Sequence, residues 1–420
     1  MADARPRRVS VIGLGYVGLP TAASIAARGI EVTGVDVDTE RLSAIASGVA
    51  PTAEADVNDL VRTVVAAGAL RTAVTPEPSD AFIIAVPTPH GPDHAPDVSF
   101  VRTAAESLAP LLRPGNLVVL ESTSPVGTTE QLCAWLAESR SDLSFPHEAG
   151  AESDMRVAYS PERAIPGNML HELTNNDRVV GGVSGPCATA AAGLYRVFVR
   201  GRCHLTCART AELVKLTENA YRDVNIAFAN EISLVCDSLG VDPWELIGLA
   251  NRHPRVDILR PGPGVGGHCI AVDPWFVVHS APERTPLIRA ARQVNGGKPL
   301  WVAEQVLAAC QGIEAPVIAC LGLAYKADVG DLRESPAIAV IERLQETCPG
   351  RLLVVEPHVD HLPPGLAAGG RTTLVSLDQA LAADVLVLLT DHQEFRRVDR
   401  TCVAGKRVID TRGTWHDKAE

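Results

Sequence analysis

Long apolar segments, paired cysteines and an excess of basic residues are all missing from this sequence of 420 residues. No apolar run approaches the roughly 18–20 residues that a membrane-spanning helix needs, so we expect no membrane span. Lys and Arg number 38 against 50 Asp and Glu, a formal charge of −12. An acidic chain repels phosphate backbones, so nucleic acid is not an expected partner. The ten cysteines are scattered without paired spacing, which favours reduced thiols in a cytoplasmic protein.

The bulk composition is that of a globular protein, with 46% hydrophobic and 21% charged residues, and it excludes a disordered or collagen-like chain. A basic start, Arg5–Arg8, runs directly into the apolar stretch Val9–Ile12 and then into glycines. This pattern indicates a first β-strand and not the apolar region of a secretory signal peptide. At roughly 100–200 residues per domain, the length predicts two or three domains.

Short β-branched runs alternate with Ala-rich helical stretches near both ends of the chain, as in βαβ units on parallel sheets. The expected strands are Val9–Ile12, Glu31–Val35, Ala81–Val86, Leu117–Leu120, Val157–Tyr159, Val317–Leu321, Leu352–Val355, Thr372–Val375, Val385–Leu389 and Val408–Ile409. The expected helices between the first strands are Thr21–Ala27, Glu40–Ser47 and Phe100–Leu112.

The middle of the chain has a different pattern. Thr210–Leu239 lacks Pro and Gly and predicts one long helix that spans between domains, and Pro286–Ala309 predicts another helix. We therefore expect an α/β protein in which two doubly wound Rossmann-like domains are joined by a helical central domain. The predicted boundaries are 1–205, 206–298 and 299–420.

The segment after the first strand, Gly13-Leu-Gly15-Tyr-Val-Gly18, has the pattern of a dinucleotide site. Its first glycine permits a tight turn, its second lets the backbone approach a pyrophosphate, and its third lets helix and strand pack closely. Asp36 ends the second strand, where a carboxylate accepts from the ribose hydroxyls and repels a 2′-phosphate. The sequence thus predicts NAD, although the glycine pattern alone also fits an unrelated α/β turn.

Other residues leave their chemistry open. Lys215 and Asn219 are four apart on the long helix, which fits either a site or a solvated polar stripe. Cys269 follows a loop rich in Gly and Pro, 261–267, and is either a nucleophile activated by a nearby lysine or a small buried residue. His268 beside it is either a base or a turn residue. No metal site is expected, because no His/Cys group, such as His90 with His94 or Cys203 with His204 and Cys207, offers four ligands at zinc spacing.

Seven motifs in order along the chain together resemble the UDP-glucose/GDP-mannose dehydrogenase family over essentially its whole length. They are Gly13–Pro20, Ala85–Pro89, Glu121–Thr128, Ser160–Arg163, Glu212–Asn219, Gly264–Asp273 and Gly322–Ser335. Within the family, the runs 154–156, 159–182, 251–255 and 261–276 are similar to the UDP-N-acetyl-D-mannosamine dehydrogenase branch.

The resemblance implies oxidation of the C6 alcohol of a nucleotide sugar to a carboxylate in two hydride transfers, with two NAD+ consumed. It also implies an NAD-binding domain, a helical linker with a dimer contact and a C-terminal domain for the UDP end. The implied substrate is a UDP-N-acetylhexosamine, with UDP-N-acetyl-D-mannosamine favoured and UDP-N-acetylglucosamine or UDP-glucose as alternatives. A nucleotide-sugar-binding protein that has lost catalysis is the alternative from another functional class.

The resemblance implies roles residue by residue. The implied catalytic residues are Cys269, Lys215, Asn219, Glu162, Asp273 and Thr123. The Cys269 thiol would carry a thiohemiacetal and then a thioester, and Lys215 with Asn219 would hold the oxyanion. Glu162, with Thr123, would position the hydrolytic water, and Asp273 would act as a second acid or base.

The implied binding residues come from all three domains. The cofactor contacts are Gly13, Gly15, Tyr16, Val17, Gly18, Asp36, Arg41, Pro87, Thr88, Thr123 and Arg333. The substrate contacts are Glu162, Arg163, Lys215, Asn219, Gly266, Gly267, Lys326 and Arg255. Arg255 would reach the sugar nucleotide of the neighbouring subunit, which implies a homodimer.

Overall fold

The computed structural model describes residues 6–52, 54–164, 167–267 and 269–416. The chain divides into two compact units. The first contains Met1–Glu218 and Trp275–Ala281, and the second contains Asn219–Pro274 and Pro282–Glu420. No helix among the described residues is long and apolar enough to cross a membrane.

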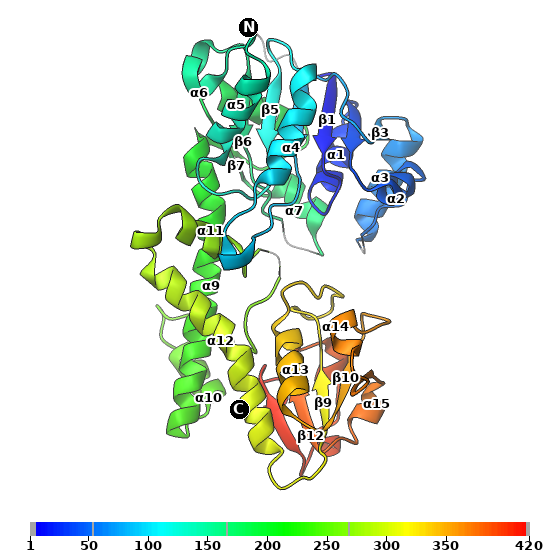
Figure 1. The fold of residues 1–420 in the computed structure, drawn as a ribbon, viewed down its shortest axis with the longest axis vertical. Coiled ribbons are helices and arrows are strands. Elements are labelled where there is room, and N and C mark those ends of the chain that lie inside the picture. Colours follow the sequence, from blue (N-terminus) through cyan, green and yellow to red (C-terminus); the bar gives the residue numbers. More distant parts are fainter. Residues whose placement is uncertain (1–5, 53, 165–166, 268, 417–420) are drawn as a thin grey trace. The chain divides into compact units, whose positions relative to one another are not determined.

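The first unit is built on a sheet of eight strands within the described residues, in the order β3-β2-β1-β4-β5-β6-β7-β8 (Figure 1). The strands are β1 (Arg8–Ile12), β2 (Glu31–Val35), β3 (Leu70–Ala73), β4 (Ala81–Ile84), β5 (Leu117–Leu120), β6 (Arg156–Tyr159), β7 (Arg178–Gly182) and β8 (Cys203–Cys207). Neighbouring strands are parallel except for β6 and β7. The chain order reverses between β1 and β4, and ligands of doubly wound sheets bind at such a reversal, beyond the carboxyl ends of the strands.

Helices connect these strands and bury both faces of the sheet. They are α1 (Gly18–Ala26), α2 (Thr39–Ala46), α3 (Ala55–Ala66), α4 (Ser99–Leu108), α5 (Thr128–Ser139), α6 (Pro146–Ala149), α7 (Met169–Asn175) and α8 (Gly185–Tyr195). In β1, Val9 and Val11 belong to the core on one face, and Ile12 belongs to the core on the other. Successive strand residues point to opposite faces, so a run of apolar residues fills both cores.

The second unit contains a parallel sheet in the order β11-β10-β9-β12-β13. Its strands are β9 (Val317–Leu321), β10 (Arg351–Val355), β11 (Thr372–Leu374), β12 (Val385–Leu388) and β13 (Arg407–Asp410). The helices around it are α13 (Pro336–Thr347), α14 (Pro364–Ala367), α15 (Leu377–Ala380) and α16 (Gln393–Arg396). The helices of the middle region are α9 (Ala208–Leu239), α10 (Pro243–Ala250), α11 (Asp273–Ser280) and α12 (Pro286–Ala309).

The predicted fold class is confirmed, including the long helix, which begins two residues earlier than expected. The helix expected over Phe100–Leu112 is wrong in extent, since α4 ends at Leu108 and a 3₁₀ turn covers Ala109–Leu111. Pro110 has no backbone N–H for the α-helical ladder, which explains the change. Strand ends shift by one or two residues in β1, β4, β6, β10, β11, β12 and β13. The predicted strands did not include β3, β7 and β8, whose apolar pattern is interrupted by Arg71 in β3, by Gly181 and Gly182 in β7, and by His204 and Thr206 in β8.

Candidate active site

The glycine turn after β1 has the geometry of a dinucleotide cradle. Gly13 has φ +94°, and a Cβ on it would strike the carbonyl of Ala85 at the end of β4. A Cβ on Gly18 would strike the carbonyl of Gly13. At Gly15, by contrast, a Cβ would meet no atom within 4 Å, so the backbone there faces open space. The first and third glycines are thus required by packing, and the second leaves room for a pyrophosphate.

Asp36 lies beside this turn and is held by three donors. Its Oδ2 accepts from Leu14 N at 2.8 Å and from Arg41 Nη1 at 3.0 Å, and its Oδ1 accepts from Asp38 N at 3.0 Å. Burial alone would raise the pKa of Asp36, but these hydrogen bonds and the Arg41 charge bring it below the ordinary value. The carboxylate therefore stays ionised, as an acceptor for ribose hydroxyls must.

A cavity opens at this turn, with an empty volume of about 510 Å³ that includes its mouth. Its lining residues include Gly15, Tyr16, Arg41, Glu54 and Met169. The Tyr16 hydroxyl donates to Glu54 Oε1 at 2.5 Å, and the same carboxylate accepts from Met169 N at 2.8 Å. The cavity thus has aromatic, cationic and anionic groups at its edge. Across the reversal point, Thr88 Oγ1 donates to the carbonyl of Thr123 at 2.6 Å, joining the segments after β4 and β5.

Glu162 comes three residues after the end of β6, and it is 9% exposed. Its Oε1 accepts from Arg163 N and Ala164 N, both at 2.6 Å. Its Oε2 accepts from Arg178 Nη1 at 3.0 Å. These donors fix the orientation of the carboxylate, which is what a base that positions water requires.

Arg178, on β7, is a residue that sequence reasoning missed. It is 4% exposed, and it also pairs with Glu121, which lies directly after β5. Burial raises the pKa of Glu121 to about 7, against the lowering effect of the Arg178 charge. Two carboxylates therefore share one buried guanidinium, whose Cζ lies over the Tyr195 ring, 3.9 Å from its centre. The sequence signal for this residue is the run Asp177-Arg-Val-Val-Gly-Gly182, in which the arginine directly precedes two β-branched residues, as at the start of a strand.

Two glutamates of the Glu212–Asn219 motif form hydrogen bonds and an ion pair with other residues of the first unit. Glu212 accepts from Gly127 N at 2.6 Å and Thr129 N at 2.8 Å, at the start of α5. Glu218 forms a two-point ion pair with Arg163, at 3.0 Å to Nε and 2.6 Å to Nη2. Lys215, on α9 between these two glutamates, is partly buried.

The second unit brings together three of the predicted catalytic residues. Asn219 Nδ2 donates to Asp273 Oδ2 at 2.6 Å, and these two residues are 6% and 3% exposed. Asp273 N donates to the carbonyl of Cys269 at 2.8 Å, in the turn that begins α11. Cys269 itself is exposed. The local arrangement thus places an accessible thiol on a turn that is connected to a buried Asp–Asn pair.

The glycines before Cys269 make room for a neighbouring segment of the same unit. A Cβ on Gly267 would lie 2.9 Å from the Tyr325 ring, and Gly267 N donates to the carbonyl of Arg333 at 3.0 Å. Arg333 pairs with Asp331 at 2.6 Å, and the Asp331 hydrogen bond raises the pKa of Arg333, with a smaller contribution from the charge of Cys269. Tyr325 and Arg333 therefore lie against the glycine that comes two residues before Cys269. Tyr325 was not among the predicted site residues.

The remaining predicted residues are dispersed. Lys326 and Arg255 are exposed in the second unit, and Pro87 is exposed in the first. Val17 precedes α1 at the glycine turn. His268 lies outside the described residues. Of the predicted catalytic set, Glu162, Thr123 and Lys215 belong to the first unit, and Asn219, Cys269 and Asp273 belong to the second.

Three family models cover nearly the whole chain. The models match the NAD binding domain over residues 7–199, the central domain over 209–296 and the UDP binding domain over 319–417 of the UDP-glucose/GDP-mannose dehydrogenase family. The chain belongs to this family. It is an NAD-dependent nucleotide-sugar dehydrogenase, and the glycine turn, Asp36 and Arg41 fit the adenosine end of NAD.

Similar proteins include dehydrogenases with two different names. An NDP-N-acetyl-D-galactosaminuronic acid dehydrogenase from Ralstonia solanacearum is 55% identical over 98% of this chain and 97% of its own. A UDP-N-acetyl-D-mannosamine dehydrogenase from Yersinia pestis is 52% identical over 97% of this chain and 99% of its own. The solved structure of a UDP-D-ManNAc dehydrogenase from Pyrococcus horikoshii matches with a TM-score of 0.86 and 37% identity, covering 98% of this chain and 96% of that one.

Proposed function

We propose that this protein oxidises the C6 alcohol of a UDP-N-acetylhexosamine to the uronic acid, and that UDP-N-acetyl-D-mannosamine is the first substrate to test. The observation that carries the proposal is the turn in which an exposed Cys269 precedes Asp273, itself bonded to Asn219. A two-step alcohol-to-acid oxidation needs a nucleophile that holds the aldehyde, and a one-step oxidation does not.

The proposed reaction has two oxidations and a hydrolysis, and each catalytic residue has a proposed role in it. When bound, NAD+ would supply the hydride acceptor for both oxidations. In the first, the C6 alcohol loses a hydride and its hydroxyl proton and becomes the aldehyde. The Cys269 thiol adds to the aldehyde carbon, and its proton leaves as the carbonyl oxygen becomes the thiohemiacetal hydroxyl. Loss of a hydride from that carbon, together with the proton of its hydroxyl, forms the thioester, and water then displaces the thiol to release the carboxylate. Lys215 and Asn219 stabilise the negative oxygen, and each such donor contributes on the order of 10²–10³ in rate.

The other roles in the proposal are those that the family resemblance implies. Glu162, with Thr123, positions the water, and Asp273 exchanges the proton of the thiol. The sugar nucleotide is held by Lys326, Arg163, Gly266 and Gly267, and Arg333 contacts the cofactor. The division 1–205, 206–298 and 299–420 assigns these tasks to an NAD-binding, a central and a UDP-binding domain.

A homodimer is part of the proposal. The described part of α9 exposes an apolar stripe at seven-residue spacing, with Tyr221 71%, Phe228 53% and Val235 44% exposed. Such a stripe is stabilised by burial against its own copy in a two-fold interface. Arg255 would then complete the partner's substrate site. The scattered cysteines support a cytoplasmic location.

A galactosamine-configured substrate is the second candidate, because the Ralstonia solanacearum relative at 55% identity bears that name. The test is a panel of UDP-N-acetylmannosamine, UDP-N-acetylgalactosamine, UDP-N-acetylglucosamine and UDP-glucose, with NADH counted per sugar consumed. We expect two NADH and a uronic acid with one of the N-acetylated sugars. Cys269→Ser should keep NAD binding and stop acid formation, because the un-ionised serine hydroxyl is a poorer nucleophile than the cysteine thiolate and an ester is a poorer acyl donor than a thioester. One NADH per sugar, or full two-NADH turnover by Cys269→Ser, would contradict the covalent mechanism.

A further inference from the structure

The second sheet repeats the local architecture of the NAD-binding turn. Gly322 follows β9 with φ +98°, as Gly13 follows β1 with φ +94°. Gly322 N donates to Val355 O at 2.8 Å, and Gly13 N donates to Val35 O at 2.8 Å. Glu356 directly follows the last residue of β10, as Asp36 directly follows the last residue of β2.

The two carboxylates make matching backbone contacts. Glu356 Oε2 accepts from Leu323 N at 2.7 Å, and its Oε1 accepts from His358 N at 3.1 Å. Asp36 accepts from Leu14 N and Asp38 N in the same two ways. Glu356 is therefore the counterpart of the carboxylate that we assign to the ribose of NAD.

The surroundings of the two carboxylates differ. Asp36 borders a cavity, whereas the side chain of Glu356 is fully buried under His392, whose Nε2 lies 3.1 Å from Glu356 Oε2. His392 follows β12 and is itself buried. Alanines, Ala324 and Ala327, stand where the NAD turn has its second and third glycines. The ribose position of the second sheet is thus filled by a side chain of the protein.

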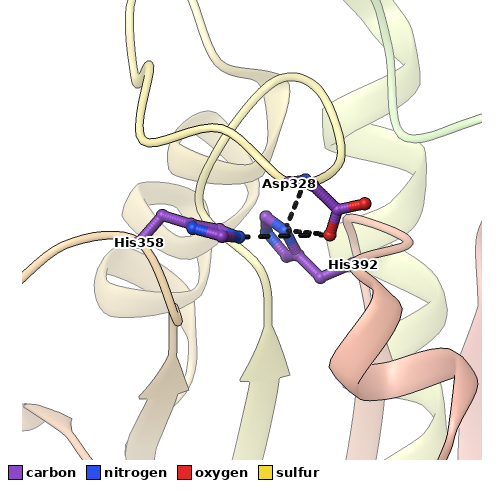
Figure 2. A group of neighbouring side chains, drawn as sticks. All are labelled: Asp328, His358 and His392. Atoms are coloured by element: carbon purple, nitrogen blue, oxygen red, sulfur yellow. Dashed lines mark hydrogen bonds and ion pairs between the residues drawn. The ribbon is translucent and has the colours of Figure 1, made fainter. Parts of the chain in front are cut away.

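The hydrogen bonds of His392 define its tautomer. Asp328 N donates to His392 Nδ1 at 2.9 Å, so Nδ1 is an acceptor and the ring proton is on Nε2, facing Glu356. Asp328 has φ +60°, and its Oδ1 accepts from Gln393 N at 2.9 Å. Figure 2 shows the Asp328 backbone and carboxylate both directed at the His392 ring. His392 thereby fixes a left-handed residue in the loop after β9.

Lys326 lies between two fixed points of that loop. On one side, Ala324 N donates to Glu356 at 2.9 Å, and Ala324 O accepts from Thr390 Oγ1 at 2.6 Å. On the other side is Asp328, two residues beyond Lys326. The side chain of Lys326 is exposed, so its position depends on the backbone that carries it.

A metal site explains the cluster of Asp328, His358 and His392 less well than a structural role does. Asp328 Oδ1 lies 3.8 Å from His392 Nδ1 and 4.0 Å from His358 Nε2, close to the spacing of metal ligands (Figure 2). However, the lone pair of His392 Nδ1 already accepts the Asp328 amide. Among the described residues, only Asp328 and His358 are left as ligands, and two ligands do not make a zinc site.

We propose that His392, together with Glu356, is a positioning residue that holds the Lys326 loop in its binding conformation for the UDP-sugar. This inference rests on the proposed function, which assigns Lys326 to the substrate. Loss of the Nδ1 acceptor should release Asp328 and let the lysine move, which raises the KM for the UDP-sugar while kcat changes little.

Two substitutions separate the two ring nitrogens. The amide oxygen of His392→Asn takes the place of Nδ1 and keeps the acceptor for Asp328 N. The side-chain amide of His392→Gln reaches the place of Nε2 and still donates to Glu356. It leaves no acceptor for Asp328 N in the loop. We expect the KM for the UDP-sugar, and the calorimetric Kd for UDP, to rise at least tenfold in His392→Gln and less than threefold in His392→Asn. His358→Ala is the control: it removes a neighbouring ring, whose Nε2 lies 4.0 Å from Asp328 Oδ1, but keeps both nitrogens of His392 and the backbone N–H of residue 358 that donates to Glu356.

A double substitution tests whether the effect passes through the lysine. In a Lys326→Ala background, His392→Gln should add less than twofold, because the group it positions is gone. Three results would each overturn the proposal. The first is an unchanged KM and Kd in His392→Gln. The second is a full additional effect of His392→Gln in the Lys326→Ala background, and the third is stoichiometric Zn²⁺ binding that is lost in His358→Ala.

If His392→Gln does not fold, Thr390→Val, which releases Ala324 O, must raise the same KM at least threefold or the proposal fails. Wild-type turnover of the UDP-sugar is measured in parallel, so that a failure of the proposed function is recognised separately, while UDP binding still tests the loop.

Discussion

Arg178 Nη1 donates to Glu162 Oε2 at 3.0 Å, and neither residue is more than 9% exposed. The same guanidinium pairs with Glu121, so a single positive charge serves two buried carboxylates. Removing one member of a buried charge group leaves the others uncompensated, which is far more costly than losing an exposed pair. Arg178 thus links the stability of the first sheet to the orientation of the proposed base.

The first prediction concerns this arginine. Arg178→Met should lower the free energy of unfolding by about 3–5 kcal/mol, because Glu121 and Glu162 lose their countercharge. Arg178→Lys keeps the charge but cannot reach both carboxylates with a planar fork, so we expect an intermediate stability and a kcat at least tenfold below wild type. Urea unfolding and NADH release measure the two effects. A wild-type kcat in a folded Arg178→Lys protein would show that Glu162 does not depend on this contact.

The second prediction concerns cofactor choice. Asp36→Ala removes the charge that repels a 2′-phosphate and frees Arg41 to meet it, so the ratio of kcat/KM for NADP to that for NAD should rise about 100-fold. Asp38→Asn is the matched control, because it removes one charge two residues away. Asp38 caps α2 by accepting from Glu40 N and Arg41 N, and asparagine preserves that cap. Equal shifts in both variants would mean that general charge, and not Asp36, sets the preference.

The sequence predicted the parts of the site whose residues are close in the chain. Gly13, Gly18 and Asp36 belong to one βαβ unit, and its turn and strand end are recognisable locally. Glu162 and Arg178, by contrast, meet only because β6 and β7 pair antiparallel, and β7 has two glycines that hide it as a strand. Glu356 and His392 likewise come from the ends of separate strands, and no local period records their contact.

The third prediction uses a buried lysine of α12. Lys298 is 3% exposed, donates to Ser233 Oγ at 2.6 Å and lies over the Trp301 ring. Burial lowers the pKa of Lys298 from 10.5 to about 8. Between pH 8 and 10.5 the unfolded chain therefore binds more protons than the folded protein, so this lysine makes stability rise with pH in that window. Below pH 8 both states are charged, and the full penalty, about 3 kcal/mol at roughly 1.4 kcal/mol per pKa unit, remains.

Lys298→Met removes this penalty. The unfolding free energy of Lys298→Met minus that of wild type should be largest near pH 7 and should decrease by about 3 kcal/mol toward pH 10.5. Loss of the Ser233 and Trp301 contacts adds a constant to this difference and does not change its dependence on pH. Urea denaturation across this range measures it. Lys406→Met, at a partly buried lysine, serves as the control for general charge. A difference that does not depend on pH would exclude the burial of a charged amine as its cause.

The last prediction concerns the shared site of the proposed homodimer. Tyr221, Phe228 and Val235 provide the exposed apolar stripe on α9, and Arg255 is exposed on the segment after α10. If Arg255 acts on the partner's substrate, Cys269→Ser and Arg255→Ala proteins should each be nearly inactive alone. In a mixed dimer, the site that takes its cysteine from the Arg255→Ala chain receives its arginine from the Cys269→Ser chain. One of the two sites is then complete, so activity should return after subunits exchange, toward half of the wild-type value per mixed dimer. Mass measurements of the mixed dimer establish that exchange has occurred. Mixed dimers without activity would place Arg255 in its own chain's site or outside any site.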